Sequence, residues 1–429
     1  MWEKRTLNNK LTKNAIMLYV MALAKIILPL LLLPYLTRIL SKDLYGTVNY
    51  VKAIMQYMQL FVDFGFMLSA TKDVALAIED KKKLCMILGE VTLARLILAF
   101  LGLIIVIITT NNISILNNNT VFVILSYIPI ALSIFFLDFL FRGLEEMHVV
   151  AIRFILARGT TTLLTFFIVK SDSDLLWIPI LEILGTVVAI ALVFKEINNR
   201  NLYFYFNLNK INNAFQKLKE SFVYFSSNIA TTAFHALNTV LVGYYLPASL
   251  VADWTICLQV AMGIQAFYTP INDAIYPYMV KKRSLMLIKK ILLAVMPIIF
   301  FGSVLLYILA PWILDLIAGI KYSNNRDLLR AFIPLIIISF PTMLFGWPCL
   351  GAIEKAKENS LTTIITAILQ CIGLIILLYI NCFTLINLAL LRAGTELFMF
   401  IMRFGVTYKY RAEFKVNQYN SYNILNKRR

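Results

Sequence analysis

The chain has 429 residues, of which 60% are hydrophobic and only 15% charged, whereas about a quarter of the residues in an average soluble domain are charged. Its apolar residues form blocks of about 20, long enough for a helix to cross a bilayer, and they lack the strict alternation of membrane β-strands. The composition therefore excludes a soluble domain and indicates an all-α integral membrane protein.

The net charge of +17 would suggest nucleic acid as a partner of a soluble protein. Here Lys and Arg gather in the segments on one side of the predicted spans, for example in 281–283 and 289–290. By the positive-inside rule this bias puts both termini in the cytoplasm. We therefore predict no nucleic-acid partner, and a multi-pass membrane protein.

About twelve spans are predicted in chain order. Those of the first half are 14–37, 46–70, 84–109, 120–141, 150–170 and 175–195, and those of the second half are 221–246, 253–279, 289–310, 328–350, 360–380 and 383–405. The expected units are an N-terminal lobe over 1–198, a cytoplasmic linker over 199–220, a C-terminal lobe over 221–406 and a basic cytoplasmic tail over 407–429.

The two halves carry a short internal match. Leu40-Ser-Lys-Asp-Leu-Tyr-Gly46 follows the first span, and Leu246-Pro-Ala-Ser-Leu-Val-Ala252 follows the seventh. Six plus six spans in the same orientation predict parallel repeats, with a central cavity between two six-helix lobes.

Cations inside the spans are the candidate functional residues. Five lie well inside a span, away from its ends: Lys25, Lys52, Arg95, Arg158 and Arg392. Each would cost about 2.5–3.5 kcal/mol at the centre of a lipid-facing helix, so these side chains should face a polar interior. Four of them lie in the first half, as a cavity that receives an anionic group such as a phosphate would need.

The alternative is that these cations pair with acids near or within the spans, namely Glu90, Asp138, Glu182 and Glu396. Arg392 and Glu396 are four residues apart and share a helix face, whereas Glu90 and Arg95 are five apart and share one less well. Lys52 and Asp63 lie on one face of a helix but too far apart to touch, so both can point into one cavity.

The eighth span is unusually polar and contains Pro270 and Pro277, so it should be kinked and cannot face lipid all round. Asn272 and Asp273, beside Pro270, are candidates for a coupling-ion site together with Asp63. Packing by hydrogen bonds between helices is the alternative.

Other chemistry finds no support in the sequence. No nucleophile elbow, phosphate-binding Gly loop or metal-ligand cluster occurs, so we predict no catalytic residue, no cofactor and no metal. The cysteines have no paired spacing and are expected as core thiols: Cys85, Cys257, Cys349, Cys371 and Cys382.

Several short stretches resemble a known family. They are Leu40-Ser-Lys-Asp-Leu-Tyr-Gly46, Asp63-Phe-Gly-Phe66, Ser69-Ala-Thr-Lys-Asp-Val74, Phe141-Arg-Gly-Leu-Glu-Glu-Met147 and Val169-Lys-Ser-Asp-Ser-Asp174. Together they resemble Wzx-type O-antigen flippases of the MOP (multidrug/oligosaccharidyl-lipid/polysaccharide) superfamily.

This resemblance implies a MATE-like fold, two six-helix lobes in a V, and movement of undecaprenyl-pyrophosphate-linked oligosaccharide to the periplasmic leaflet by alternating access. It implies a role in O-antigen and lipopolysaccharide biosynthesis, H⁺ or Na⁺ as coupling ion, and a polysaccharide polymerase and chain-length regulator as partners. Lys25, Lys52, Arg95 and Arg158 would then face the pyrophosphate and acidic sugar.

Three other functions fit the sequence less well. A multidrug exporter of the same superfamily would bind organic cations, so we would expect acids rather than cations in its cavity. A lipid II flippase usually has fourteen spans. A polysaccharide polymerase or ligase, which is a membrane enzyme, would need a large external loop, and the longest external stretch here, 311–327, is short and apolar.

Overall fold

The computed structural model describes residues 2–205 and 211–414, and all regular structure in this part of the chain is helical. Ten of its helical segments are long and apolar enough to cross a membrane. The prediction of an all-α, multi-pass membrane protein is thereby confirmed. The count of twelve stays a prediction, because α2 and α10, which carry more polar residues, are not among the ten.

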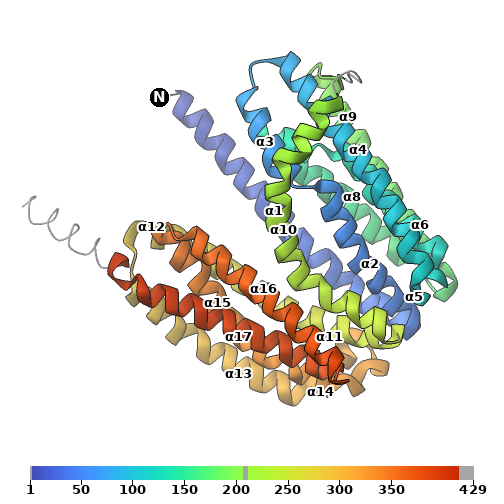
Figure 1. Cartoon of the computed structure of the whole chain (residues 1–429), viewed down its shortest axis with the longest axis vertical. Helices are drawn as coiled ribbons and strands as arrows, with labels where there is room; N and C mark the ends of the chain where they lie inside the picture. Colours follow the sequence, from blue (N-terminus) through green and yellow to red (C-terminus); the bar gives the residue numbers. More distant parts are fainter. Residues whose placement is uncertain (1, 206–210, 415–429) are drawn as a thin grey trace, which may run out of the picture. The chain divides into compact units, whose positions relative to one another are not determined.

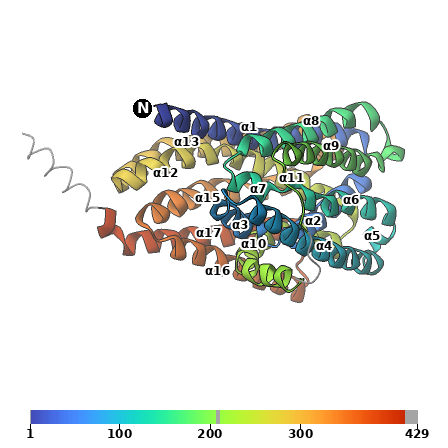
Figure 2. The same ribbon diagram turned by 90° about the horizontal axis from the view of Figure 1, so that it is seen from above.

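The chain forms two compact units, 1–252 and 253–429. The helices of the first unit are α1 (Trp2–Ile39), α2 (Lys42–Asp63), α3 (Phe66–Leu76), α4 (Lys81–Asn112), α5 (Ser114–Asn117), α6 (Thr120–Leu132), η1 (Ser133–Phe136), α7 (Asp138–Gly143), α8 (Met147–Ile168), η2 (Asp172–Asp174), α9 (Trp177–Asn199) and α10 (Ile211–Tyr245). Within this unit α8 packs between α1 and α9 (Figures 1 and 2).

The second unit begins inside α11. Its helices are α11 (Ala248–Ala266), α12 (Tyr268–Lys282), α13 (Leu285–Ala318), η4 (Ile320–Asn325), α14 (Arg326–Ala331), α15 (Ile333–Leu344), η5 (Phe345–Leu350), η6 (Gly351–Ile353), α16 (Ala356–Tyr379), α17 (Leu385–Lys409) and η7 (Arg411–Phe414). Here α17 packs against both α15 and α16, drawn in orange and red in Figure 1.

Two predicted spans of the first unit are broken helices. The span predicted at 46–70 is divided at Phe64 and Gly65, which adopt left-handed conformations with φ of 39° and 79°. The span predicted at 120–141 is divided at Leu137, with φ of 51°. The half-helices beyond the breaks, α3 and α7, pack together, and an added Cβ at Gly143 would lie 2.4 Å from the Val74 side chain. Two of the family-like stretches, Ser69–Val74 and Phe141–Met147, therefore contact each other through α3 and α7.

Helix α10 packs on the first unit. It contacts α2, α3 and α4, and the Ser69 and Ser221 hydroxyls lie 2.6 Å apart. Lys217 pairs with Asp73. Burial disfavours the charged form of Lys217, but Asp73, Glu220 and Glu90 together more than offset this effect and raise the pKa of the ammonium. Because α10 begins at Ile211 and packs here, the compact division falls later in the chain than the linker expected at 199–220.

The two matched stretches of the internal repeat lie against each other. An ideal Cβ on Gly46 would lie 1.7 Å from the Ala248 carbonyl oxygen and 3.2 Å from the Ala252 nitrogen. Only glycine permits this approach of the first turn of α2 to the first turn of α11. The two backbones therefore touch at the start of each matched helix.

Kinks in the second unit follow its prolines and glycines. The eighth predicted span is divided between α11 and α12, with Pro270 in the first turn of α12, which confirms the expected kink. Helix α15 runs into a wide turn at η5, where Gly346 has ψ of −115° and Pro348 follows. All five cysteines are free, and Cys382 is exposed, so it is not the core thiol that we predicted.

Candidate functional site

The first part of the site forms where α2 ends at its break. Asp63 is the last residue of α2, and its carboxylate accepts hydrogen bonds from Arg95 Nη2 (2.6 Å) and Gln59 Nε2 (2.9 Å). Arg95, on α4, also donates to the carbonyl oxygen of Ile134, at 3.3 Å. This oxygen belongs to η1, the irregular turn ahead of the second helix break. The Arg95 guanidinium thus joins the two broken helices.

A second ion pair lies beside the other break. Asp138 is the first residue of α7, and both of its carboxylate oxygens accept from Arg153 Nη2, at 2.8 and 2.9 Å. The Arg153 guanidinium also lies 3.9 Å from the centre of the Phe136 ring, a cation–π contact. Only 7% of the Arg153 side chain is exposed, so Asp138 neutralises a cation that water hardly reaches.

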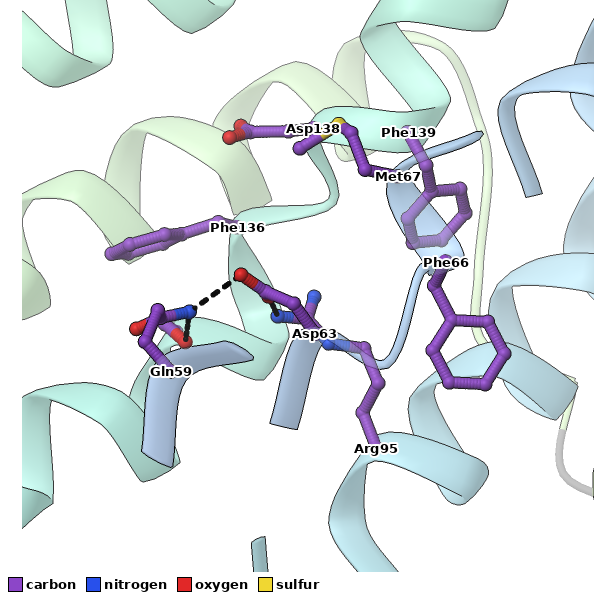
Figure 3. A pocket seen from close by; sticks show the side chains of 9 residues that line it. Gln59, Asp63, Phe66, Met67, Arg95, Phe136, Asp138 and Phe139 are labelled. Carbon is purple, nitrogen blue, oxygen red and sulfur yellow. Dashed lines mark hydrogen bonds and ion pairs between the residues drawn. The ribbon is translucent and has the colours of Figure 1, made fainter. Parts of the chain in front are cut away.

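A small pocket, partly open to solvent, lies between the two acids. Figure 3 shows Gln59, Asp63 and Arg95 at one end of it and Asp138 at the other. Both broken helices line this space.

Two further cations belong to this group. Lys25, on α1, is exposed, and its Nζ lies 5.4 Å from the centre of the Phe154 ring on α8. It interacts electrostatically with Asp138, Arg153 and Arg142, the last of these on α7. We call the whole set the Asp138 cluster: Lys25, Asp63, Arg95, Asp138, Arg142 and Arg153.

A smaller charged group lies further along α8. Arg158 donates from Nη1 to Glu182 Oε1 of α9 at 2.9 Å, and 53% of its side chain is exposed. Lys52, on α2, is exposed and interacts electrostatically with both members of this pair. It forms no ion pair of its own with the described residues. We call this set the Glu182 cluster: Lys52, Arg158 and Glu182.

Cations outnumber acids in both clusters. The Asp138 cluster has four cations and two carboxylates, and the Glu182 cluster has two cations and one carboxylate. Taking charges out of water is costly unless they are paired, and the acids neutralise only part of the positive charge in each cluster.

The second unit has a buried charged group of its own. Arg403 donates to Thr362 Oγ1 (3.2 Å), to the Thr342 carbonyl oxygen (2.9 Å) and to Thr363 Oγ1 (3.0 Å). Thr342 lies just before the wide turn at the end of α15, so Arg403 supplies a hydrogen bond to a backbone carbonyl oxygen next to this turn. Arg392 and Glu396 are both buried and interact electrostatically, as their spacing of four residues predicted.

The candidate ion-coupling residues have different surroundings. Asp63 is the partner of Arg95. Asn272, on α12, is buried and donates to the Tyr268 carbonyl oxygen at 2.9 Å, and its side-chain oxygen has no hydrogen-bond partner. Asp273, the next residue, is exposed. No group of His, Cys, Asp and Glu residues in 2–205 and 211–414 is arranged to hold a metal ion.

Comparison with known proteins gives the family. Residues 11–283 match the family described as "Polysaccharide biosynthesis protein". The chain belongs to this family. A family member of Shigella dysenteriae, curated as "Putative O-antigen transporter", is 27% identical over 356 residues, which cover 82% of this chain and 88% of the relative. A protein of Escherichia coli K12 with the same description is 27% identical over 377 residues, 84% of this chain and 89% of its own.

A solved structure supports the fold of this polysaccharide biosynthesis protein. The inward-facing conformation of a multidrug resistance MATE family transporter of the MOP superfamily superposes with a TM-score of 0.61 at 13% identity, covering 90% of this chain and 98% of the other. Identity this low establishes the fold alone. The resemblance to O-antigen transporters is confirmed by the family and the two relatives, and the MATE-like fold is confirmed by the solved structure.

In this family member, the four cations predicted to face a cavity differ in their partners. Lys25, Lys52, Arg95 and Arg158 all lie in the first unit. Arg95 pairs with Asp63 and Arg158 with Glu182, so the alternative of pairing with acids holds for these two, and Glu90 forms no ion pair with Arg95.

Two residues of the Asp138 cluster were missed. Arg153 lies three residues into its predicted span, 150–170, but was not among the candidates; the structure buries it. Arg142 was noted only within the family-like stretch after the fourth span. Their spacing from Asp138 along the chain was the available signal, because all three come within 16 residues.

Proposed function

We propose that this protein is a flippase that moves undecaprenyl-pyrophosphate-linked oligosaccharide units from the cytoplasmic to the periplasmic leaflet of the bacterial inner membrane. Family membership, the two curated relatives and the MATE-like fold support a transporter rather than an enzyme. The observation that carries the proposal is the excess of cations over acids in both charged clusters of the first unit.

The pyrophosphate is the anionic group of the substrate that these cations would bind. It must leave water to cross the bilayer, and Arg and Lys supply charge-assisted hydrogen bonds that replace its hydration. Lys25, Lys52 and Arg158 are exposed and free to meet it. Arg95 also lines the pocket, and its hydrogen bonds to Asp63 and Ile134 link the two helix breaks.

Coupling to an ion gradient is part of the proposal. Asp63 is the first candidate, because its carboxylate accepts from Arg95, which joins the two broken helices. Asn272 and Asp273 are the second candidates, since the unpartnered Asn272 oxygen suits Na⁺, a cation that binds oxygen ligands. Transport driven by a proton gradient or by a sodium gradient in Asp63→Asn and Asp273→Asn variants separates these assignments.

A multidrug exporter of organic cations is the runner-up. The cation excess argues against it, because an organic cation would be repelled by both clusters. A drug-efflux assay in a strain that lacks other exporters tests this function directly.

Deletion of the gene in a bacterium that displays surface polysaccharide tests the proposal. We expect polymer to disappear and lipid-linked single units to accumulate on the cytoplasmic face, with recovery by the wild-type gene and not by Lys25→Gln, provided the variant reaches the membrane at equal level. Single units that reach the surface without being polymerised would instead identify a polymerase and refute the proposal.

A further inference from the structure

The turn between α12 and α13, in the second unit, concentrates cations without acids. Within 281–290 the cations are Lys281, Lys282, Arg283, Lys289 and Lys290, and no Asp or Glu occurs anywhere in 274–314. Two other turns predicted on the cytoplasmic side mix both signs, since 79–83 has two acids and three lysines and 354–358 has two of each. The positive-inside rule does not account for this separation, because acids contribute little to it.

The turn keeps these cations close together. Only Arg283 and Ser284 separate the last residue of α12 from the first of α13. Arg283 donates to Glu354 Oε1 at 3.1 Å. Lys289 and Lys290 are exposed and form no ion pair with the described residues of the chain. The described part of the protein thus leaves these two ammonium groups without a counter-charge.

An exposed apolar surface continues from the two lysines along α13. Leu293 and Phe300 are 67% and 62% exposed, and an interval of seven residues puts both on one face of the helix. Lys289 and Lys290 lie within about 60° on either side of this line. The segment 291–314 carries no charge and is long enough to cross about 30 Å of hydrocarbon. The lysines therefore stand at headgroup level, directly beside a surface that faces acyl chains.

A phospholipid fits both parts of this surface. A soluble acidic partner would neutralise the lysines but would leave Leu293 and Phe300 uncovered. A zwitterionic lipid would bring its own ammonium group against the same cations. An anionic lipid supplies phosphate for the turn and acyl chains for the face of α13. Two phosphates in one lipid, as in cardiolipin, match the group of five cations better than one.

We propose that the α12–α13 turn is a binding site for an anionic phospholipid of the cytoplasmic leaflet. Its phosphates accept hydrogen bonds from Lys289, Lys290 and the cations of 281–283, and its acyl chains lie along Leu293 and Phe300. This lipid is a resident partner of the second unit, distinct from any lipid-linked substrate bound at the charged clusters of the first unit.

The test measures lipid binding to the purified full-length chain in detergent by native mass spectrometry. Tetraoleoyl cardiolipin and dioleoyl phosphatidylethanolamine are titrated separately. One cation near a membrane surface strengthens the binding of anionic lipid about fivefold, so two unpaired lysines should give wild type a preference for cardiolipin of at least about 25-fold. The double variant Lys289→Gln with Lys290→Gln should lose about this factor for cardiolipin and keep the wild-type affinity for phosphatidylethanolamine.

Two further double variants complete the comparison. Lys81→Gln with Lys82→Gln is the matched control, because these exposed lysines also lie near the start of a long apolar helix, α4, but follow the acid Asp80. It should leave the affinity for cardiolipin unchanged. Lys289→Arg with Lys290→Arg keeps both charges and should keep the preference. Unchanged binding of phosphatidylethanolamine shows that the variants are folded.

Three results would overturn the proposal. One is equal affinity of wild type for the two lipids. Another is an equal loss of cardiolipin binding in the Lys81/Lys82 and Lys289/Lys290 glutamine variants, since any pair of cytoplasmic lysines would then serve. The third is displacement of cardiolipin by an equimolar amount of polyprenyl pyrophosphate, which would assign the surface to the substrate lipid instead. The assay involves no transport, so its result does not depend on the flippase function.

Discussion

Replacing Asp138 by Asn is expected to destabilise the protein strongly. Asp138→Asn keeps the shape of the side chain but removes the charge that meets Arg153 at 2.8 and 2.9 Å. The Arg153 side chain is only 7% exposed, so solvent cannot replace the lost carboxylate. Removal of one partner from a buried ion pair costs about 3–5 kcal/mol. The Asn oxygen still accepts one hydrogen bond, so we expect about 3 kcal/mol.

The double variant Asp138→Leu with Arg153→Met distinguishes a lost ion pair from general damage. Apolar residues in place of both partners of a buried pair are often neutral or even stabilising, so the double variant should be more stable than Asp138→Asn. Unfolding by sodium dodecyl sulfate in mixed micelles, followed by far-ultraviolet circular dichroism, measures the differences. Glu79→Gln, at an exposed turn, is the control and should change stability by less than about 0.5 kcal/mol. A cost below about 1 kcal/mol for Asp138→Asn, or a double variant no more stable than the single one, would refute this reasoning.

Three further predictions use the same unfolding assay. Gly46→Ala should destabilise the protein by about 1–3 kcal/mol or more, because the added Cβ would lie 1.7 Å from a backbone oxygen of α11. Gly159→Ala is the control: nothing lies within 4 Å of its added Cβ, so its stability should be unchanged or slightly higher. Equal losses of stability in the two variants would contradict the close approach at Gly46. The Lys217–Asp73 pair is partly exposed and should contribute about 1 kcal/mol, measured by a double-mutant cycle. Because the pKa of Lys217 is raised in the folded state, its contribution to the free energy of unfolding should be constant near neutral pH and be lost only as pH rises beyond 10.5. A loss of this contribution near pH 7 would show that it does not come from the Lys217–Asp73 pair. Arg403→Lys keeps the charge but not the three-fold donor pattern and should cost about 2 kcal/mol, whereas wild-type stability would show that the charge alone matters.

The sequence determined that the protein is a bundle of membrane helices and where most helices lie. Apolar length and spacing are properties of consecutive residues, so the span predicted at 84–109 is observed as Lys81–Asn112 and that at 360–380 as Ala356–Tyr379. The cost of a charge in lipid also follows from residue type, which is why Lys25, Lys52, Arg95 and Arg158 were recognised as candidate site residues.

Only the tertiary structure decided how those charges combine. The partners of Arg95 and Arg158 are 32 and 24 residues away along the chain, and such pairs depend on how neighbouring helices are rotated and where they break. The left-handed residues Phe64 and Leu137 end two helices in the middle of predicted spans, which places Asp63 and Asp138 on either side of one cavity. The break at Leu137, a non-glycine residue, is imposed by packing, so neither periodicity nor composition could have revealed it. At the other break, Gly65 beside Phe64 was a local signal in the sequence.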